Sequence, residues 1–157
     1  MLTHIDENLN PVMVDVSEKA VTLRTAEAES LVYLPLPIIP DLRHGGDLVG
    51  PKGPVFHTAV VAGIMGAKRT WELIPMCHPL PVEKCSIHLE IVSETEVRVA
   101  CKVSATHKTG VEMEALTGAS IAALTLYDMV KALSPAIEIR YTRLLTKEGG
   151  KRSYHRG

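Results

Sequence analysis

One long apolar segment, residues 108–133, organises the rest of this chain; it reads KTGVEMEALTGASIAALTLYDMVKAL. Its many alanines, with leucine, isoleucine and methionine between them, predict a helix that is apolar or small on nearly every side. A helix of this kind is usually covered on more than one side. In a two-layer domain one side would face water, so the pattern predicts that a second subunit covers this helix in a homo-oligomer.

Four ionisable residues interrupt this helix: Glu112, Glu114, Asp128 and Lys131. Asp128 and Lys131 are three residues apart and therefore share one face. On a surface such a pair contributes only ~0.2–0.5 kcal/mol. Among apolar neighbours, desolvation would perturb the pKa values of both groups, which is typical of functional sites. Glu112 and Glu114 lie in the first turn, where a simple role at the positive end of the helix dipole is an alternative.

The spacing of these charges limits what they can do together. Glu114 and Asp128 are 14 residues apart, which is about 21 Å along a helix. They cannot act on the same atom from one chain. Either they serve opposite ends of an extended ligand, or each belongs to a site that a neighbouring subunit completes.

Alternating patterns on both sides of the helix predict an α+β fold. We expect strands at residues 21–34, 85–93, 97–106 and 137–147, and a second helix at 55–74. The order β-α-β-β-α-β is that of the ferredoxin-like split βαβ, an antiparallel sheet with helices packed on one face. Residues 35–54 are rich in proline and glycine, and loops of this length are often functional or disordered.

Length and composition fit one globular domain over residues 1–157, with mobile termini expected at 1–11 and 149–157. The formal net charge of −1 gives no general attraction to nucleic acid or an anionic membrane. An odd number of cysteines without a secretory signal predicts reduced thiols in the cytoplasm. No run of 18 uninterrupted apolar residues is present, so we expect no membrane-spanning helix.

The segment IPMCHPLP, residues 74–81, has several interpretations. A metal site is poorly supported, because Cys77 and His78 are adjacent and no CxxC or HxxxH accompanies them. A Cys–His nucleophile is also poorly supported, because adjacent side chains of an extended segment point to opposite faces. The prolines stiffen the backbone, so the segment is either a ligand-contacting loop or a rigid connector.

Basic residues lie on loops and element ends: Lys52, Lys68, Arg69, Lys147 and Lys151. Each one alone is most simply a solvated charge. Together they could form a phosphate-binding pocket. Neither a Walker GxxxxGK[ST] nor a GxGxxG motif is present.

Four stretches closely resemble the MoaC family of cyclic pyranopterin monophosphate synthases: VDVSEKAVTLRTA, AGIMGAKRTWELIPMCHPL, the opening segment and RLLTKEGGKRS. The resemblance extends over residues 3–153. It implies a ferredoxin-like fold and a lyase of molybdenum cofactor biosynthesis without a bound cofactor or metal. The substrate would be 3′,8-cyclo-7,8-dihydro-GTP, and the products cyclic pyranopterin monophosphate and pyrophosphate. The assembly would be a hexamer, a trimer of dimers, with active sites at the dimer interfaces.

The resemblance also implies roles for individual residues. The catalytic residues would be Asp128, Lys131 and Lys52. The substrate-binding residues would be Met76, Cys77, His78, Glu112, Met113, Glu114, Arg24 and Lys147. This chain departs from the common pattern in the loop that holds Lys52, since relatives commonly carry a Lys-Gly-Asp run and Pro54 stands here.

Two functions of other classes use the same topology. A non-catalytic purine-nucleotide-binding regulatory module is one, although mere binding would not need the pair Asp128 and Lys131. An RNA-binding module is the other, and it would need stacking aromatic residues on its central strands. Residues 85–93 and 97–106 contain none.

Overall fold

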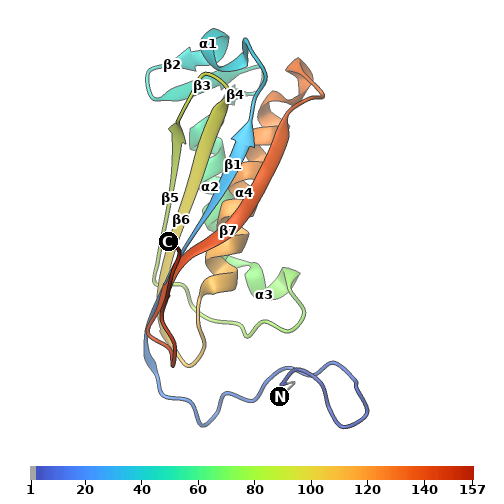
Figure 1. The fold of residues 1–157 in the computed structure, drawn as a ribbon, viewed down its shortest axis with the longest axis vertical. Helices are drawn as coiled ribbons and strands as arrows, with labels where there is room; N and C mark the ends of the chain where they lie inside the picture. Colours follow the sequence, from blue (N-terminus) through green and yellow to red (C-terminus); the bar gives the residue numbers. More distant parts are fainter. Residues whose placement is uncertain (1–2) are drawn as a thin grey trace.

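The computed structural model describes residues 3–157 and has two layers, a five-stranded sheet with two long helices on one face (Figure 1). The main strands are β1 Thr22–Tyr33, β5 Lys84–Ile91, β6 Glu96–His107, β7 Glu138–Glu148 and the short β8 Tyr154–His155. The helices are α1 Ile38–Leu42, α2 Val55–Lys68, α3 Thr70–Leu73 and α4 Glu112–Val130, followed by the 3₁₀ turn η1 Lys131–Leu133.

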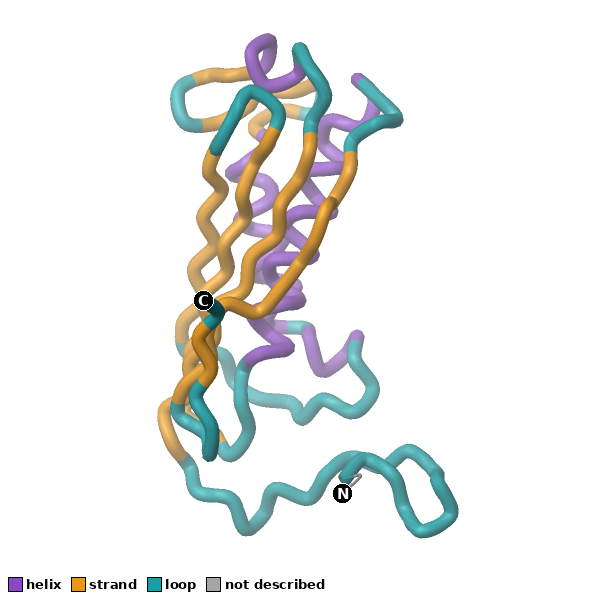
Figure 2. The backbone as a smooth tube through the Cα atoms, viewed as in Figure 1, coloured by secondary structure: helices purple, strands orange, loops and turns teal. Residues whose placement is uncertain are grey.

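The sheet has the order β5-β6-β1-β7-β8, and every neighbouring pair is antiparallel. The first strand of the chain is therefore central, between β6 and β7. This order and the helices on a single face, visible in Figure 2, confirm the ferredoxin-like α+β fold. Alternate residues of β6 face the helices, because side chains of a strand alternate between its two faces. The buried residues of this strand are Val97, Val99, Cys101, Val103 and Ala105.

Small residues allow α2 and α4 to pack closely against each other and against the sheet. An added Cβ at Gly63 would lie 2.9 Å from the carbonyl oxygen of Gly118 and 3.0 Å from the Cβ of Ala122. On α4, the alanines 115, 119, 122 and 123 are fully buried. Only Met113, Leu124 and Asp128 of α4 are exposed in the single chain. Coverage of this remaining face by another subunit stays a prediction.

Two segments differ from the expected elements. The helix expected at 55–74 is interrupted at Arg69, so that α2 and α3 are separate. The buried hydroxyl of Thr70 donates to the carbonyl of Ala67 at 2.9 Å, a local bond that competes with continued helix. Residues 35–54, expected to be irregular, form α1 and a small antiparallel sheet of β2 Arg43–His44, β3 Asp47–Gly50 and β4 Gly53–Pro54.

In Figure 1 the N-terminal segment lies below the sheet, whereas the chain after β7 turns at the lower end and returns upward to the C-terminus. Strand β8 pairs with β7, which gives part of the 149–157 segment regular structure, although its expected mobility stays a prediction. Mobility is also expected for residues 1 and 2, which lie outside the described residues. Within residues 3–157 one helix, Glu112–Leu133, is long and apolar enough to cross a membrane, a test that core helices also pass.

Candidate active site

The three residues expected to be catalytic meet at the C-terminal end of α4. The Nζ of Lys52 lies 2.9 Å from one carboxylate oxygen of Asp128, and the Nζ of Lys131 lies 3.0 Å from the other. We call Lys52, Asp128 and Lys131 the lysine–aspartate cluster. The carboxylate is thus held between two ammonium groups that come from different parts of the chain.

A short hairpin brings Lys52 to this position. Strands β3 and β4 pair Val49 with Pro54 and Gly50 with Gly53, so Lys52 lies in the two-residue turn between them. Gly53 adopts a φ of +102°, which favours glycine. An added Cβ at Gly50 would lie 3.4 Å from the carbonyl oxygen of Met129, so the hairpin packs directly against the end of α4.

The electrostatic environment of Asp128 differs from the sequence-based expectation. We expected an apolar surrounding whose desolvation would perturb the pKa values. Instead the three side chains of the cluster are about half exposed in the single chain, and Asp128 is 51% exposed. Hydrogen bonds from Lys52 and Lys131 lower the pKa of the Asp128 carboxyl. The last turn of α4 is buried at Met129 and Val130, whereas Asp128 between them and Leu126 lies on the exposed side of the same turn.

A second group of expected site residues surrounds the N-terminal end of α4. The Nζ of Lys147, on β7, donates to the carboxylate of Glu112 at 2.5 Å. Met113 is exposed, whereas Glu114 is only 4% exposed. Burial, with a smaller contribution from the charge of Glu112, raises the pKa of Glu114 to about 7. A carboxyl with a pKa near neutrality can exchange a proton under physiological conditions.

The segment after α3 reaches the same end of α4. Burial and the negative charges of Glu114 and Glu112 raise the pKa of the Cys77 thiol, which places Cys77 near both carboxylates. A thiol with a raised pKa stays protonated and is a poor nucleophile. The neighbouring ring of His78 donates from Nε2 to the carbonyl of Val14 at 2.6 Å. Met76 is partly buried in the same segment.

Arg24 anchors the turn that precedes α4. Its guanidinium donates to the backbone carbonyls of His107 at 3.3 Å, Lys108 at 3.2 Å and Ala20 at 3.4 Å. These bonds join β1 to the turn between β6 and α4. Arg24 therefore has a structural contact of its own, besides the substrate-binding role that the resemblance implies.

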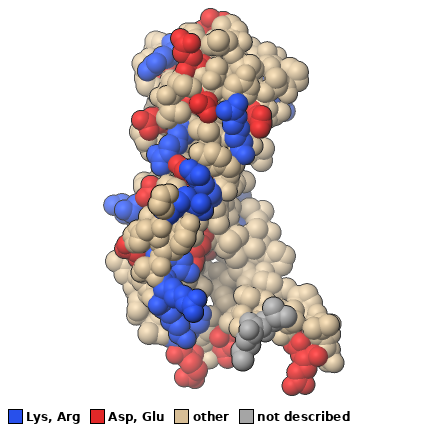
Figure 3. Space-filling model, viewed as in Figure 1, with Lys and Arg blue, Asp and Glu red and all other residues tan. Residues whose placement is uncertain are grey.

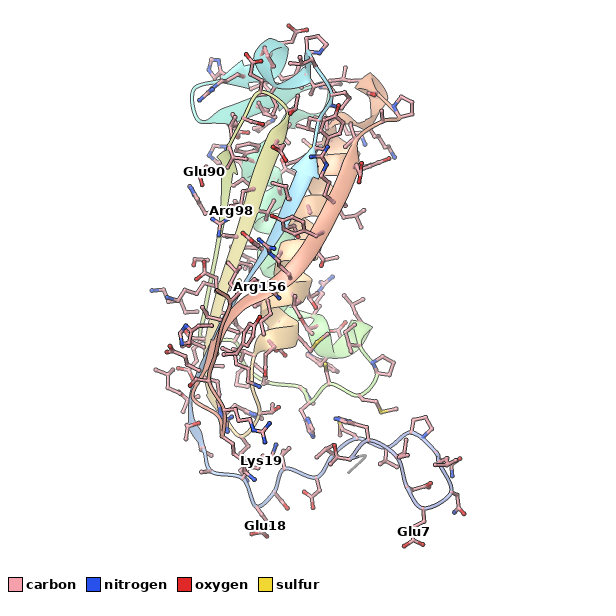
Figure 4. The ribbon with its side chains drawn as sticks, in the orientation of Figure 1. Glu7, Glu18, Lys19, Glu90, Arg98 and Arg156 are labelled. Carbon is pink, nitrogen blue, oxygen red and sulfur yellow. The ribbon has the colours of Figure 1, made fainter. Side chains whose placement is uncertain are left out.

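An open cavity of about 1110 Å³ lies beside Arg24, Glu112 and Lys147. Basic side chains outnumber acidic ones in its lining; they are Lys19, Arg24, Lys147, Lys151 and Arg152. Figure 4 shows Lys19 on the extended segment before β1, below the sheet, and Figure 3 shows basic side chains gathered at this lower end. Converging cations of this kind suit a phosphorylated ligand.

The expected residues therefore form two groups at opposite ends of α4. The spacing of Glu114 and Asp128 predicted this separation. It also means that Lys52 and Lys147 do not line one pocket within a single chain. Two other basic residues, Lys68 and Arg69, are exposed at the end of α2. The sequence analysis did not select Lys19 and Arg152 as site residues, although both lie within stretches that resemble the family. In the described part of the chain no three His, Cys, Asp or Glu side chains are placed to hold a metal ion.

Comparisons with known proteins show which family this chain belongs to. A sequence model of the MoaC family matches residues 13–150. The cyclic pyranopterin monophosphate synthase of Xanthomonas axonopodis pv. citri is 54% identical over 151 residues, covering 96% of this chain and 91% of the relative. That of Brevibacillus brevis is 48% identical, covering 99% and 96%. The molybdenum cofactor biosynthesis bifunctional protein of Synechocystis is 47% identical, with 44% of its length covered. This chain belongs to the MoaC family.

Proposed function

We propose that this protein acts as a cyclic pyranopterin monophosphate synthase in molybdenum cofactor biosynthesis. Relatives that bear this name match it over nearly their whole length. The substrate would be 3′,8-cyclo-7,8-dihydro-GTP. The purine-derived ring is opened and closed again as a pterin, and a hydroxyl attacks the α-phosphate. That attack forms the cyclic monophosphate and releases pyrophosphate, so the enzyme would be a phosphorus–oxygen lyase.

The observation that carries this proposal is the bridging position of Asp128 between Lys52 and Lys131. Ring opening and closure need several proton transfers; in these the ionised Asp128 would accept protons and the neighbouring ammonium groups would donate them. The same cations can stabilise negative charge that develops on the substrate. A protein that only bound nucleotides would not need this arrangement.

The second group would hold the rest of the substrate. In this proposal the basic cavity takes part of the triphosphate, while Glu112, Met113 and Glu114 contact another part together with residues 76–78. Because the pKa of Glu114 is raised to about 7, its protonated and ionised forms coexist at neutral pH, so this carboxyl could donate or accept a hydrogen bond to the substrate. Because the groups lie at opposite ends of α4, one complete site takes them from two chains.

We further propose that the chain is a single MoaC-like domain over residues 1–157 that assembles in the cytoplasm as a hexamer, a trimer of dimers. Exposed apolar side chains on the two helices support an additional contact; Val61 and Met65 of α2 and Leu124 of α4 are 59%, 46% and 55% exposed. The half-exposed lysine–aspartate cluster would become drier at such an interface.

The test is a single-turnover assay with 3′,8-cyclo-7,8-dihydro-GTP that measures pyrophosphate release and pterin fluorescence after oxidation. We expect both signals from the unmodified protein, and neither from Asp128→Asn or Lys131→Ala. Glu90→Gln, an exposed change on β5, is the matched control and should retain both. Binding of the compound without either signal would favour the regulatory-module alternative.

Mixing two inactive variants tests the shared site. Asp128→Ala and Glu114→Ala chains are unfolded together, refolded together and assayed. We expect partial recovery of activity, because some mixed sites receive Asp128 from one chain and Glu114 from another. If every mixture stays inactive while mixed assemblies form, the site is not shared in this way.

A further inference from the structure

We propose that Asp47 is a positioning residue for Lys52. Its carboxylate caps the start of α2 from strand β3, and this contact joins the two ends of the segment that carries Lys52. This inference rests on the proposed role of Lys52 beside Asp128. Asp47 lies at the start of β3 and is only 9% exposed. It does not itself belong to the lysine–aspartate cluster.

The start of α2 lacks a cap of its own. Its N-cap residue is Pro54, which makes no capping hydrogen bond through its side chain. The first amides of a helix have no partner within the helix and need an acceptor from elsewhere. A Ser, Thr, Asp or Asn at the N-cap would normally accept from the second or third helical amide. Here these are the amides of Phe56 and His57.

Asp47 accepts these two amides from a distance in sequence. The amide of Phe56 donates to one carboxylate oxygen at 2.7 Å, and the amide of His57 donates to the other at 3.3 Å. The Nδ1 of His57 also lies 2.6 Å from the second oxygen. The carboxylate thus performs the N-cap function from β3. Its negative charge also suits the positive end of the α2 dipole.

The carboxylate is bound at the strand side as well. The amide of Leu48 donates to Asp47 at 2.6 Å, so one group ties together the start of β3 and the start of α2. Burial by itself would raise the pKa of Asp47. The hydrogen bonds from Phe56 and Leu48, with those from His57, outweigh burial and lower it. A carboxylate this well satisfied is a firm anchor, since a buried unpaired one would be strongly unfavourable.

The segment closed by Asp47 is the one that holds Lys52. Between Asp47 and Phe56 the chain makes only the β3–β4 hairpin, and Lys52 lies in its turn. The hairpin and α2 follow each other without a linker, because β4 ends at Pro54 and α2 begins at Val55. Loss of the cap would let the first turn of α2 fray, three residues from Lys52. The lysine would then lose its fixed approach to Asp128.

The first test is kinetic. We expect Asp47→Ala to lower kcat by about tenfold or more, because small misplacements of a reacting group are costly, while KM changes by less than about threefold. Adding Pro54→Asp to that variant places a carboxylate at the N-cap itself and should restore kcat to within about threefold of the unmodified protein. His57→Ala is the control, since it removes the imidazole contact and keeps both amides; its kcat should stay within about threefold.

The second test does not need enzymatic activity. The Asp128 carboxyl is titrated by carbon-13 NMR in the unmodified protein, in Lys52→Ala and in the Asp47 variants. We expect Asp47→Ala to shift the midpoint upward, towards that of Lys52→Ala, and Pro54→Asp to reverse the shift. This readout reports whether Lys52 still contacts Asp128, which a general loss of stability in a folded protein would not change.

The two tests separate the inference from the proposed function. If the unmodified protein lacks synthase activity, the titration still decides whether Asp47 positions Lys52. A folded Asp47→Ala protein with unchanged kcat and an unchanged Asp128 midpoint would overturn the inference. Should Asp47→Ala fail to fold, Asp47→Asn, which keeps one acceptor oxygen, is measured in its place. Unchanged values there would overturn the inference equally.

Discussion

Glu114 should make the stability of this protein fall as the pH rises towards neutrality. The side chain is 4% exposed, and its pKa is raised from an ordinary 4.5 to about 7 in the folded protein. The folded state therefore holds a proton that the unfolded state has already lost between these two values. By linkage, the stabilisation is fully present below pH 4.5 and is lost as the pH rises to about 7. At 1.36 kcal/mol per pKa unit, the loss is up to about 3 kcal/mol.

The assay compares urea unfolding of the unmodified protein and of Glu114→Gln at pH 5 and at pH 8, at one fixed protein concentration. Glutamine keeps the shape and cannot ionise. We expect Glu114→Gln to be similar in stability at pH 5 and more stable by up to about 3 kcal/mol at pH 8. Glu90→Gln, exposed on β5, controls for general charge effects. A difference between Glu114→Gln and the unmodified protein that does not change between the two pH values would refute the reasoning.

Two further predictions concern packing and buried charge. Gly63→Ala should lower the free energy of unfolding by about 1–3 kcal/mol, because its Cβ would lie 2.9 Å from the backbone carbonyl oxygen of Gly118, which cannot rotate away as a side chain can. Gly46→Ala, with no atom within 4 Å of the added carbon, should leave the free energy of unfolding unchanged. Thermal unfolding of both variants measures the difference. Glu29→Gln should cost about 1–3 kcal/mol, because Glu29 is 5% exposed between two arginines. Glu96→Gln, in a more exposed pair, should cost under about 1 kcal/mol in denaturant titrations, and equal losses would contradict this ranking.

Most of the fold could be predicted from the sequence, because the buried face of each strand or helix requires apolar residues at a regular spacing. In β6 the residues that face the helices are apolar, whereas Arg98 and Lys102 face the open side, so the alternation was readable. The long helix was equally clear from its alanines. The break at Arg69 was not, because it depends on a buried hydroxyl in the next residue. The small sheet in residues 35–54 was missed since its strands have only two to four residues.

The site was predictable to a different degree in each part. Helical spacing alone placed Asp128 and Lys131 together and separated them from Glu114. The contact between Lys52 and Asp128 spans 76 positions of sequence and was expected only through the family resemblance. Asp47 gave no sequence signal, because a helix cap is normally sought next to the helix. The lowered pKa of Asp128 depends on hydrogen bonds from Lys131 and from the sequence-distant Lys52, and a helical pattern does not reveal the second of these.

The central place of β1 has a consequence for how this chain folds during synthesis. Its partners are β6 and β7, which end at residues 107 and 148. The innermost strand is synthesised before both of its partners and cannot be flanked on both sides until β7 has been made. Topologies dominated by such distant pairings fold slowly, and unpaired strands are prone to aggregate in the meantime. Truncation before β7 would therefore leave an unfinished sheet with β1 as an open edge, so the native sheet should form only after β7 has been synthesised.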